Sequence, residues 1–249
     1  MSNKQPRSFL KMLKDNDLHA WVFTTGAIVL IIEVVAVRIL APYFGNTLFA
    51  YSSVISVILL ALSAGYWYGG QLADRKPERR LFYSLIAAGG LLLLFIETFR
   101  EPLLEAANRN LSLTTGPLLS SIILFIGPAL LLGMLSPMAI KIRSVEQPKT
   151  GIGTIAGGMF FWSTLGSISG SLAAGFWLVP TFGVDAIMLS QGVILILLGG
   201  LPLLRLGVIS LRMLVGLFAL TSGLGVFSAV ANSVDKPYII YESDGIYEH

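Results

Sequence analysis

The sequence has 249 residues, of which 55% are hydrophobic and 12% are charged, and its formal net charge is +3 at pH 7. Soluble domains contain about a quarter charged residues, so this composition favours a single polytopic membrane domain. The absence of cysteine excludes disulfides and thiol chemistry. The two histidines, His19 and His249, stand at opposite ends of the chain, so we expect neither a histidine metal site nor a cofactor. The small positive charge fits loops that orient membrane proteins and does not indicate nucleic-acid binding.

Long apolar segments dominate the chain after a polar lead at residues 1–17. The first apolar segment is too long for a signal peptide, and a membrane span needs about 20 such residues. We therefore predict an all-α bundle of about seven transmembrane helices at residues 18–230, followed by a polar tail at residues 231–249. The predicted spans are residues 18–40, 48–72, 81–99, 117–140, 152–179, 184–204 and 207–230.

The distribution of basic residues predicts an orientation. Most of the 17 Lys and Arg residues fall in segments that are cytoplasmic if the N-terminus is inside. Basic residues concentrate in cytoplasmic loops, so we expect a multi-pass inner-membrane protein with its N-terminus inside. Seven spans then place the tail outside. Of the connections, residues 41–47 predict a short turn, and residues 101–107 predict a short surface helix.

Two stretches carry family motifs. The helix exit GQLADR at residues 70–75, followed by Arg79 and Arg80, resembles the loop between the second and third helices of major facilitator transporters. Glu33, the LAPYFG turn at residues 40–45 and the helix end GYWYGGQLADR are together similar to a narrower family. That family is the fused major-facilitator-like/spermidine synthase (polyamine aminopropyltransferase) proteins, in their membrane region.

This resemblance implies a bundle like half of a major facilitator transporter. It also implies that the tail YESDGIYEH corresponds to the first hairpin of a synthase domain, where Asp-Gly between apolar residues is a hairpin signal. The chain contains no nucleotide-binding or catalytic motif, so we do not expect it to be an enzyme by itself.

Three functions are compatible with this reading. The first is a non-catalytic membrane module that anchors or serves a spermidine-synthase-like domain or partner in polyamine metabolism. The second is a transporter or half-transporter for a small cation or polyamine, with Glu33 as its charge site. The third is a structural assembly subunit. The expected partners are the lipid bilayer, a synthase-like protein and a further copy of the chain.

Two ionisable residues fall within or near the first span. A carboxylate inside a membrane must be neutral, paired or facing water, so Glu33 is a candidate proton or amine site, or else a hydrogen-bonded strut between helices. Arg38 lies nearer the interface, where its side chain can reach the headgroups or cap the following turn. The two positions point about 140° apart around a helix, so a pair between them is not expected. Both are candidate substrate-binding residues.

The charged loop after the second span is the strongest short motif. Its candidate residues are Asp74, Arg75, Arg79 and Arg80. In the transporters that it resembles, this loop braces the inner ends of helices, with the Asp against a helix N-terminus and the Arg residues against carboxylates. The alternative is an anchor on anionic lipid, and the two roles are compatible.

Small residues recur at every fourth position in two spans, a pattern typical of close helix contact in membranes. On the fifth span, Ser167 begins a parallel stripe whose hydroxyls could bond a neighbour's carbonyls. We predict that the second and fifth spans pack against each other. The packing residues are Ala61, Gly65, Gly69 and Ala73 in the second span and Gly166, Gly170 and Ala174 in the fifth.

Overall fold

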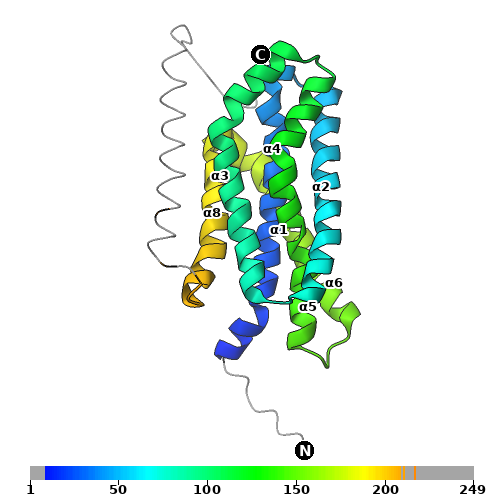
Figure 1. Ribbon diagram of the computed structural model, residues 1–249, viewed down its shortest axis with the longest axis vertical. Helices are drawn as coiled ribbons and strands as arrows, with labels where there is room; N and C mark the ends of the chain where they lie inside the picture. The colour runs from blue at the N-terminus through cyan, green and yellow to red at the C-terminus, as the bar shows by residue number, and fades with distance from the viewer. Residues whose placement is uncertain (1–8, 209, 211–215, 217–249) are drawn as a thin grey trace, which may run out of the picture.

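The computed structural model describes residues 9–208, 210 and 216, and every regular element in this part is helical (Figure 1). The predicted all-α fold class is therefore confirmed. In chain order the elements are α1 (Phe9–Phe44), α2 (Leu48–Arg75), α3 (Arg79–Asn110), α4 (Thr115–Gly133), α5 (Leu135–Glu146), α6 (Ile152–Ala173), the π-helix η1 (Ala174–Leu178), α7 (Val179–Phe182) and α8 (Val184–Arg205).

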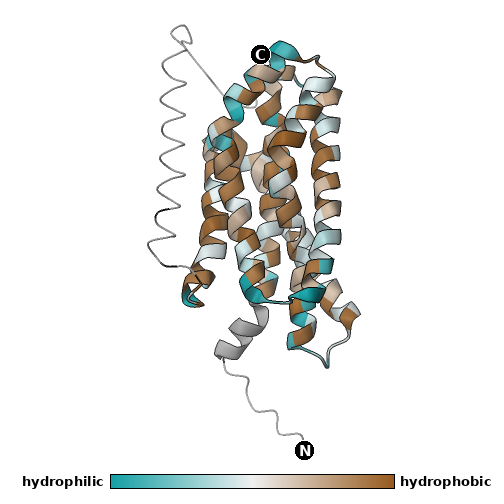
Figure 2. Ribbon diagram, in the orientation of Figure 1, coloured by the Kyte–Doolittle hydropathy of each residue, from teal (hydrophilic) through white to brown (hydrophobic). Residues whose placement is uncertain are grey.

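Six helical segments are long and apolar enough to cross a membrane, and we number them spans 1 to 6. Hydrophobic residues cover their middle parts, while hydrophilic residues gather at their ends (Figure 2). The chain is therefore a multi-pass membrane helix bundle. The predicted seventh span at residues 207–230 and the tail lie outside the described residues, except for residues 207, 208, 210 and 216. The six spans are Leu18–Phe44, Leu48–Arg75, Arg79–Asn110, Thr115–Glu146, Ile152–Phe182 and Val184–Arg205.

Two helix ends differ from the prediction. Span 1 includes Pro42 in its last turn and ends at Phe44, because Gly45 adopts a φ of 72° and bonds its amide to the carbonyl of Ala41 at 2.8 Å. This left-handed glycine is a common helix stop, and it shortens the predicted turn. α3 continues to Asn110 instead of ending before a separate surface helix, because the buried Leu104 extends its apolar face into the core.

Spans 4 and 5 are interrupted, which the prediction did not include. Span 4 consists of α4 and α5, with Met134 between them. Pro137 has no amide hydrogen to donate to the carbonyl of Gly133, so the break falls where the helix is weakest. Span 5 passes through the π-turn η1 just before Pro180. Such turns inside α-helices occur often at functional sites.

The helices pack in three main pairs: α1 with α6, α2 with α4, and α3 with α8. The predicted pairing of the second and fifth spans is wrong. Each of these spans does use its small residues for close contact, but α2 faces α4 and α6 faces α1. A small-residue stripe makes close approach possible without specifying which neighbour approaches, because any helix backbone fits against it.

The same glycine contact occurs at two of these crossings. A Cβ atom added to Gly65 would collide with the carbonyl oxygen of Leu130, and a Cβ added to Gly166 would collide with that of Phe23. One turn further along, a Cβ on Gly69 would lie 2.6 Å from the Cα of Met134, and one on Gly170 would lie 2.7 Å from the Cα of Ala27. The crossing of spans 4 and 2 therefore repeats the crossing of spans 1 and 5.

The third crossing repeats within itself. A Cβ on Gly90 of α3 would lie 2.6 Å from the carbonyl oxygen of Gly192 of α8. In the reciprocal contact, a Cβ on Gly199 of α8 would collide with the carbonyl oxygen of Tyr83 of α3. The α3–α8 crossing is therefore two-fold symmetric in itself, with Gly90 equivalent to Gly199 and Tyr83 equivalent to Gly192.

These contacts relate spans 1–3 to spans 4–6 by an approximate two-fold axis. Successive spans alternate in direction, so span 1 and its equivalent, span 4, run in opposite directions (Figure 1). The axis therefore lies in the plane of the membrane, as in proteins built from inverted repeats. The difference in residue number between a residue of span 1 and its equivalent in span 4 is constant. The equivalent residues are Phe23 and Leu130, Gly26 and Gly133, and Ala27 and Met134.

Candidate functional site

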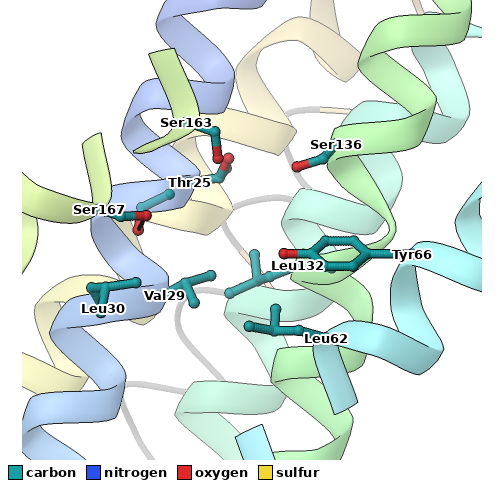
Figure 3. A pocket seen from close by; sticks show the side chains of 11 residues that line it. Thr25, Val29, Leu30, Leu62, Tyr66, Leu132, Ser136, Ser163 and Ser167 are labelled. Carbon is teal, nitrogen blue, oxygen red and sulfur yellow. Dashed lines mark hydrogen bonds between the residues drawn. The ribbon is translucent and has the colours of Figure 1, made fainter. Parts of the chain in front are cut away.

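A cavity of about 70 Å³ lies inside the bundle, among spans 1, 2, 4 and 5 (Figure 3). One water needs about 10–15 Å³ on this measure, so the cavity has room for several waters or a small organic group. Side chains from both sides point into the space between them. The lining residues are Thr25, Gly26, Val29, Leu30, Leu62, Tyr66, Leu132, Gly133, Ser136, Ser163 and Ser167.

The cavity lies on the approximate two-fold axis. Every lining residue except Leu30 has its symmetry equivalent in the lining as well. The pairs are Thr25 with Leu132, Gly26 with Gly133, Val29 with Ser136, Leu62 with Ser163, and Tyr66 with Ser167. A site on such an axis contacts both repeats, which is where solute sites occur in inverted-repeat carriers.

Hydroxyl groups supply most of the polar lining. Thr25 donates its hydroxyl proton to the carbonyl of Trp21 at 2.9 Å, and Ser167 donates to the carbonyl of Gly26 across the helix pair at 3.1 Å. The predicted use of Ser167 to bond a neighbour's carbonyl is confirmed. The hydroxyls of Ser136 and Ser163 make no hydrogen bond to any described residue.

The break in span 4 forms one wall of the cavity. Gly133 and Ser136, on either side of Met134, both line it. Because Pro137 cannot donate to the carbonyl of Gly133, this wall contains a backbone acceptor that lacks its usual helical donor. Interrupted helices place backbone groups at the solute sites of carriers in this way. The equivalent part of span 1 has Leu30 where span 4 has Pro137, and α1 is continuous there.

Glu33 lies on the cavity side of span 1. It follows Val29 by one turn and Gly26 by two turns, so the three share one face of α1, with Glu33 about 6 Å beyond Val29 along the axis. Its side chain is half-buried, and it makes no ion pair or hydrogen bond with a described residue. This position sets a carboxyl group beside a hydroxyl-lined space.

Arg38 is not brought to the cavity. It lies near the end of α1, one turn before Pro42, and forms no ion pair with Glu33 or with another residue in the described part of the chain. As expected from their angular separation, the two residues are not partners. This position fits a side chain that extends toward the membrane interface.

The charged loop after α2 contacts α5. Asp74 accepts from the ammonium of Lys141 at 2.7 Å, and Arg79 binds both carboxylate oxygens of Glu146 at 2.6 and 2.9 Å. Within the described residues Asp74 pairs with this lysine side chain and not, as expected, with a helix N-terminus. Together these pairs tie spans 2 and 3 to the end of span 4. We call this the basic end of the bundle.

Two other basic residues of the loop do not take part in these pairs. Arg75 and Arg80 are exposed and form no ion pair within residues 9–208. They remain free for anionic lipid headgroups, which attract basic residues near the membrane surface.

At the opposite end lies a charge cluster that was not predicted from the sequence, in which Glu97 and Arg100 are buried and Asp185 is exposed. Arg100 falls just beyond the predicted span at residues 81–99, yet its side chain is only 9% exposed and binds Glu97 at 3.0 Å and Asp185 at 2.5 Å. The side chain of Glu97 is 8% exposed. These bonds link α3 to the start of α8. The only sequence signal was an arginine and a glutamate one turn apart at the end of an apolar run.

Apart from Ser167, the residues that line the cavity were not predicted from the sequence either. Isolated Ser and Thr residues in apolar helices usually bond the carbonyl one turn earlier, so they give no signal of a site. The internal repeat would have supplied one. Gly65 and Gly69 in span 2 correspond to Gly166 and Gly170 in span 5, and the residue that follows the first glycine of each pair, Tyr66 or Ser167, lines the cavity.

Comparison of the chain with models of known protein families, with curated proteins and with solved structures gave no match.

Proposed function

We propose that this chain is a transporter-like membrane module, a carrier or half-carrier that binds a small cationic solute between its two three-span repeats. The observation that carries the proposal is the position of the cavity on the two-fold axis, with its lining drawn from both repeats. Carriers built from inverted repeats alternate access by moving one repeat against the other around such a site. The interrupted spans 4 and 5 provide the points at which helices bend.

The charged contacts at the two ends fit this reading. At the basic end, Asp74 and Arg79 hold spans 2 and 3 to span 4. At the opposite end, Arg100 holds span 3 to span 6. Ion pairs that join separate spans only at their ends stabilise one arrangement and leave the middle of the bundle free to repack.

The test is uptake by the full chain reconstituted in liposomes, with radiolabelled methylammonium as the probe. The natural sequence has no cysteine, so cysteines can be placed at Asp74 and Lys141 and joined by a short bifunctional reagent. We expect saturable uptake that stops when this cross-link closes the basic end. The two single-cysteine variants, treated with the same reagent, are the controls. Absence of uptake by the native chain overturns the proposal.

A second proposal comes from the sequence motifs. The similarity of residues 40–45 and 65–75 to the spermidine-synthase fusion family supports a membrane module that anchors a synthase-like partner. A pull-down in mild detergent, with and without residues 232–249, tests this proposal. Recovery of a synthase-like protein that depends on the tail supports it, and recovery of the chain alone refutes it.

A further inference from the structure

The hydrogen bonds already made by the cavity hydroxyls restrict what the cavity can bind. A hydroxyl has one proton to donate and two lone pairs that accept. Thr25 and Ser167 have committed their protons to the carbonyls of Trp21 and Gly26. From these two side chains, therefore, the cavity is offered lone pairs alone.

The rest of the polar lining adds acceptors and no fixed donor. Ser136, Ser163 and Tyr66 have hydroxyls that make no hydrogen bond to a described residue, so each can rotate to accept. The broken helix adds Gly133 to the lining, and the carbonyl of this residue lacks its usual helical donor because Pro137 has no amide hydrogen. No Lys, Arg or His lines the cavity. Such a lining suits a ligand that only donates.

We propose that this cavity binds a primary ammonium group, the protonated end of a small alkylamine. Such a group has three N–H donors and no acceptor, as the lysine ammonium does, and it is protonated at pH 7. Glu33, on the same face of α1 and about one turn beyond Val29, contributes a neutralising charge. The inference rests on the proposed function in that it names the class of solute which the carrier would move.

Binding to the purified chain in detergent tests the site separately from transport. Equilibrium dialysis with radiolabelled methylammonium should show saturable binding, and n-butylammonium should displace it. Tetramethylammonium has the same charge but no N–H donor, so it should compete at least tenfold less well. If tetramethylammonium, sodium or potassium displaces the probe as well as n-butylammonium does, the site recognises charge alone and the inference is wrong. Absence of saturable binding also overturns it and leaves a water-filled cavity.

The chain offers matched control variants. Thr24 and Thr25 each donate to the carbonyl four residues earlier, at 2.9 Å, but only Thr25 lines the cavity. Ser169 likewise bonds Leu165 on the outward face of α6. We expect Thr25→Val to weaken binding by about tenfold or more, since hydrogen bonds to charged groups are the stronger kind. Thr24→Val and Ser169→Ala should leave binding unchanged.

Two further variants keep the test informative if Thr25→Val does not fold. Ser163→Ala removes a hydroxyl that makes no bond to a described residue, so the fold loses no hydrogen bond with it. It should also weaken binding severalfold. Glu33→Gln keeps the shape and removes the charge, and should weaken binding about tenfold at the distance expected. Wild-type affinity in both variants would refute the site.

The two proposals fail in different ways. Binding that depends on Thr25 and Ser163, with no uptake in liposomes, keeps the ammonium site and refutes the transporter. Uptake that is unchanged by these substitutions keeps the transporter and refutes the site.

Discussion

The glycine contacts allow a sharp test of the helix pairing. Gly166 and Gly157 lie on the same helix, α6, but a Cβ added to Gly166 would collide with the backbone of Phe23, whereas one added to Gly157 meets nothing within 4 Å. Substitution by alanine gives both positions the same gain in helix propensity, about 0.5–1 kcal/mol. Gly166→Ala alone also forces the neighbouring backbone to move, which should lower the unfolding free energy by about 1–3 kcal/mol by analogy with overpacked cores.

The difference in unfolding free energy between the two variants therefore isolates the crossing of α1 and α6. Reversible unfolding in mixed micelles, followed by circular dichroism, measures it. We expect Gly157→Ala to be slightly more stable than the native chain and Gly166→Ala to be less stable than Gly157→Ala by about 1–3 kcal/mol. Equal stabilities within about 0.5 kcal/mol would refute the close contact.

The two-fold relation extends this prediction to α2. Gly65 faces Leu130 as Gly166 faces Phe23, so Gly65→Ala should cost about as much as Gly166→Ala. A loss at one position without a loss at the other would contradict the repeat.

Two other predictions concern the ends of the bundle. Replacing Arg100 with methionine leaves Glu97 buried without its partner and should lower the unfolding free energy by about 3–5 kcal/mol. The control is Arg109→Met, which removes an exposed pair and should change the unfolding free energy by under about 1 kcal/mol. Equal effects of the two substitutions would contradict the burial of Glu97 and Arg100. A double-mutant cycle on Arg79 and Glu146, both partly exposed, should give a coupling energy of about 1 kcal/mol or less. Salt screens exposed charges, so this coupling energy should fall as the salt concentration is raised. A coupling energy that does not change with salt would refute this prediction.

Much of the fold could be predicted from hydropathy alone. Membrane spans are long and apolar, so their existence, and most of their ends, can be read directly from the sequence. The exceptions are instructive. A glycine at residue 45 stopped span 1 after Pro42 rather than before it, and Pro137 divided span 4, because local backbone chemistry is superimposed on the hydropathy pattern.

Helix neighbours and the candidate site could not be predicted in the same way. Both depend on contacts between residues far apart in sequence, such as Arg100 with Asp185 and Ser167 with Gly26. The stripe of Gly65 and Gly69 indicated a close contact but not its partner. The cavity hydroxyls resemble ordinary serines and threonines until four spans bring them together. Glu33 became a candidate because a carboxylate within an apolar run is conspicuous in the sequence, and its role stays a prediction.

The inverted repeat has a consequence for how the chain enters the membrane. Its two three-span units make the same kind of helix contacts, yet they must be inserted in opposite orientations. The connections that correspond by the two-fold differ in charge: the segment after α2 has basic residues at 75, 76, 79 and 80, while the segment from η1 to α8 has none before Arg205. Lys and Arg resist translocation, so these residues would direct the first unit, while Lys141, Arg143 and Lys149, between the first two spans of the second unit, would direct that unit the opposite way. Moving the basic residues of both connections to their two-fold equivalents would thus be a means of inverting the protein.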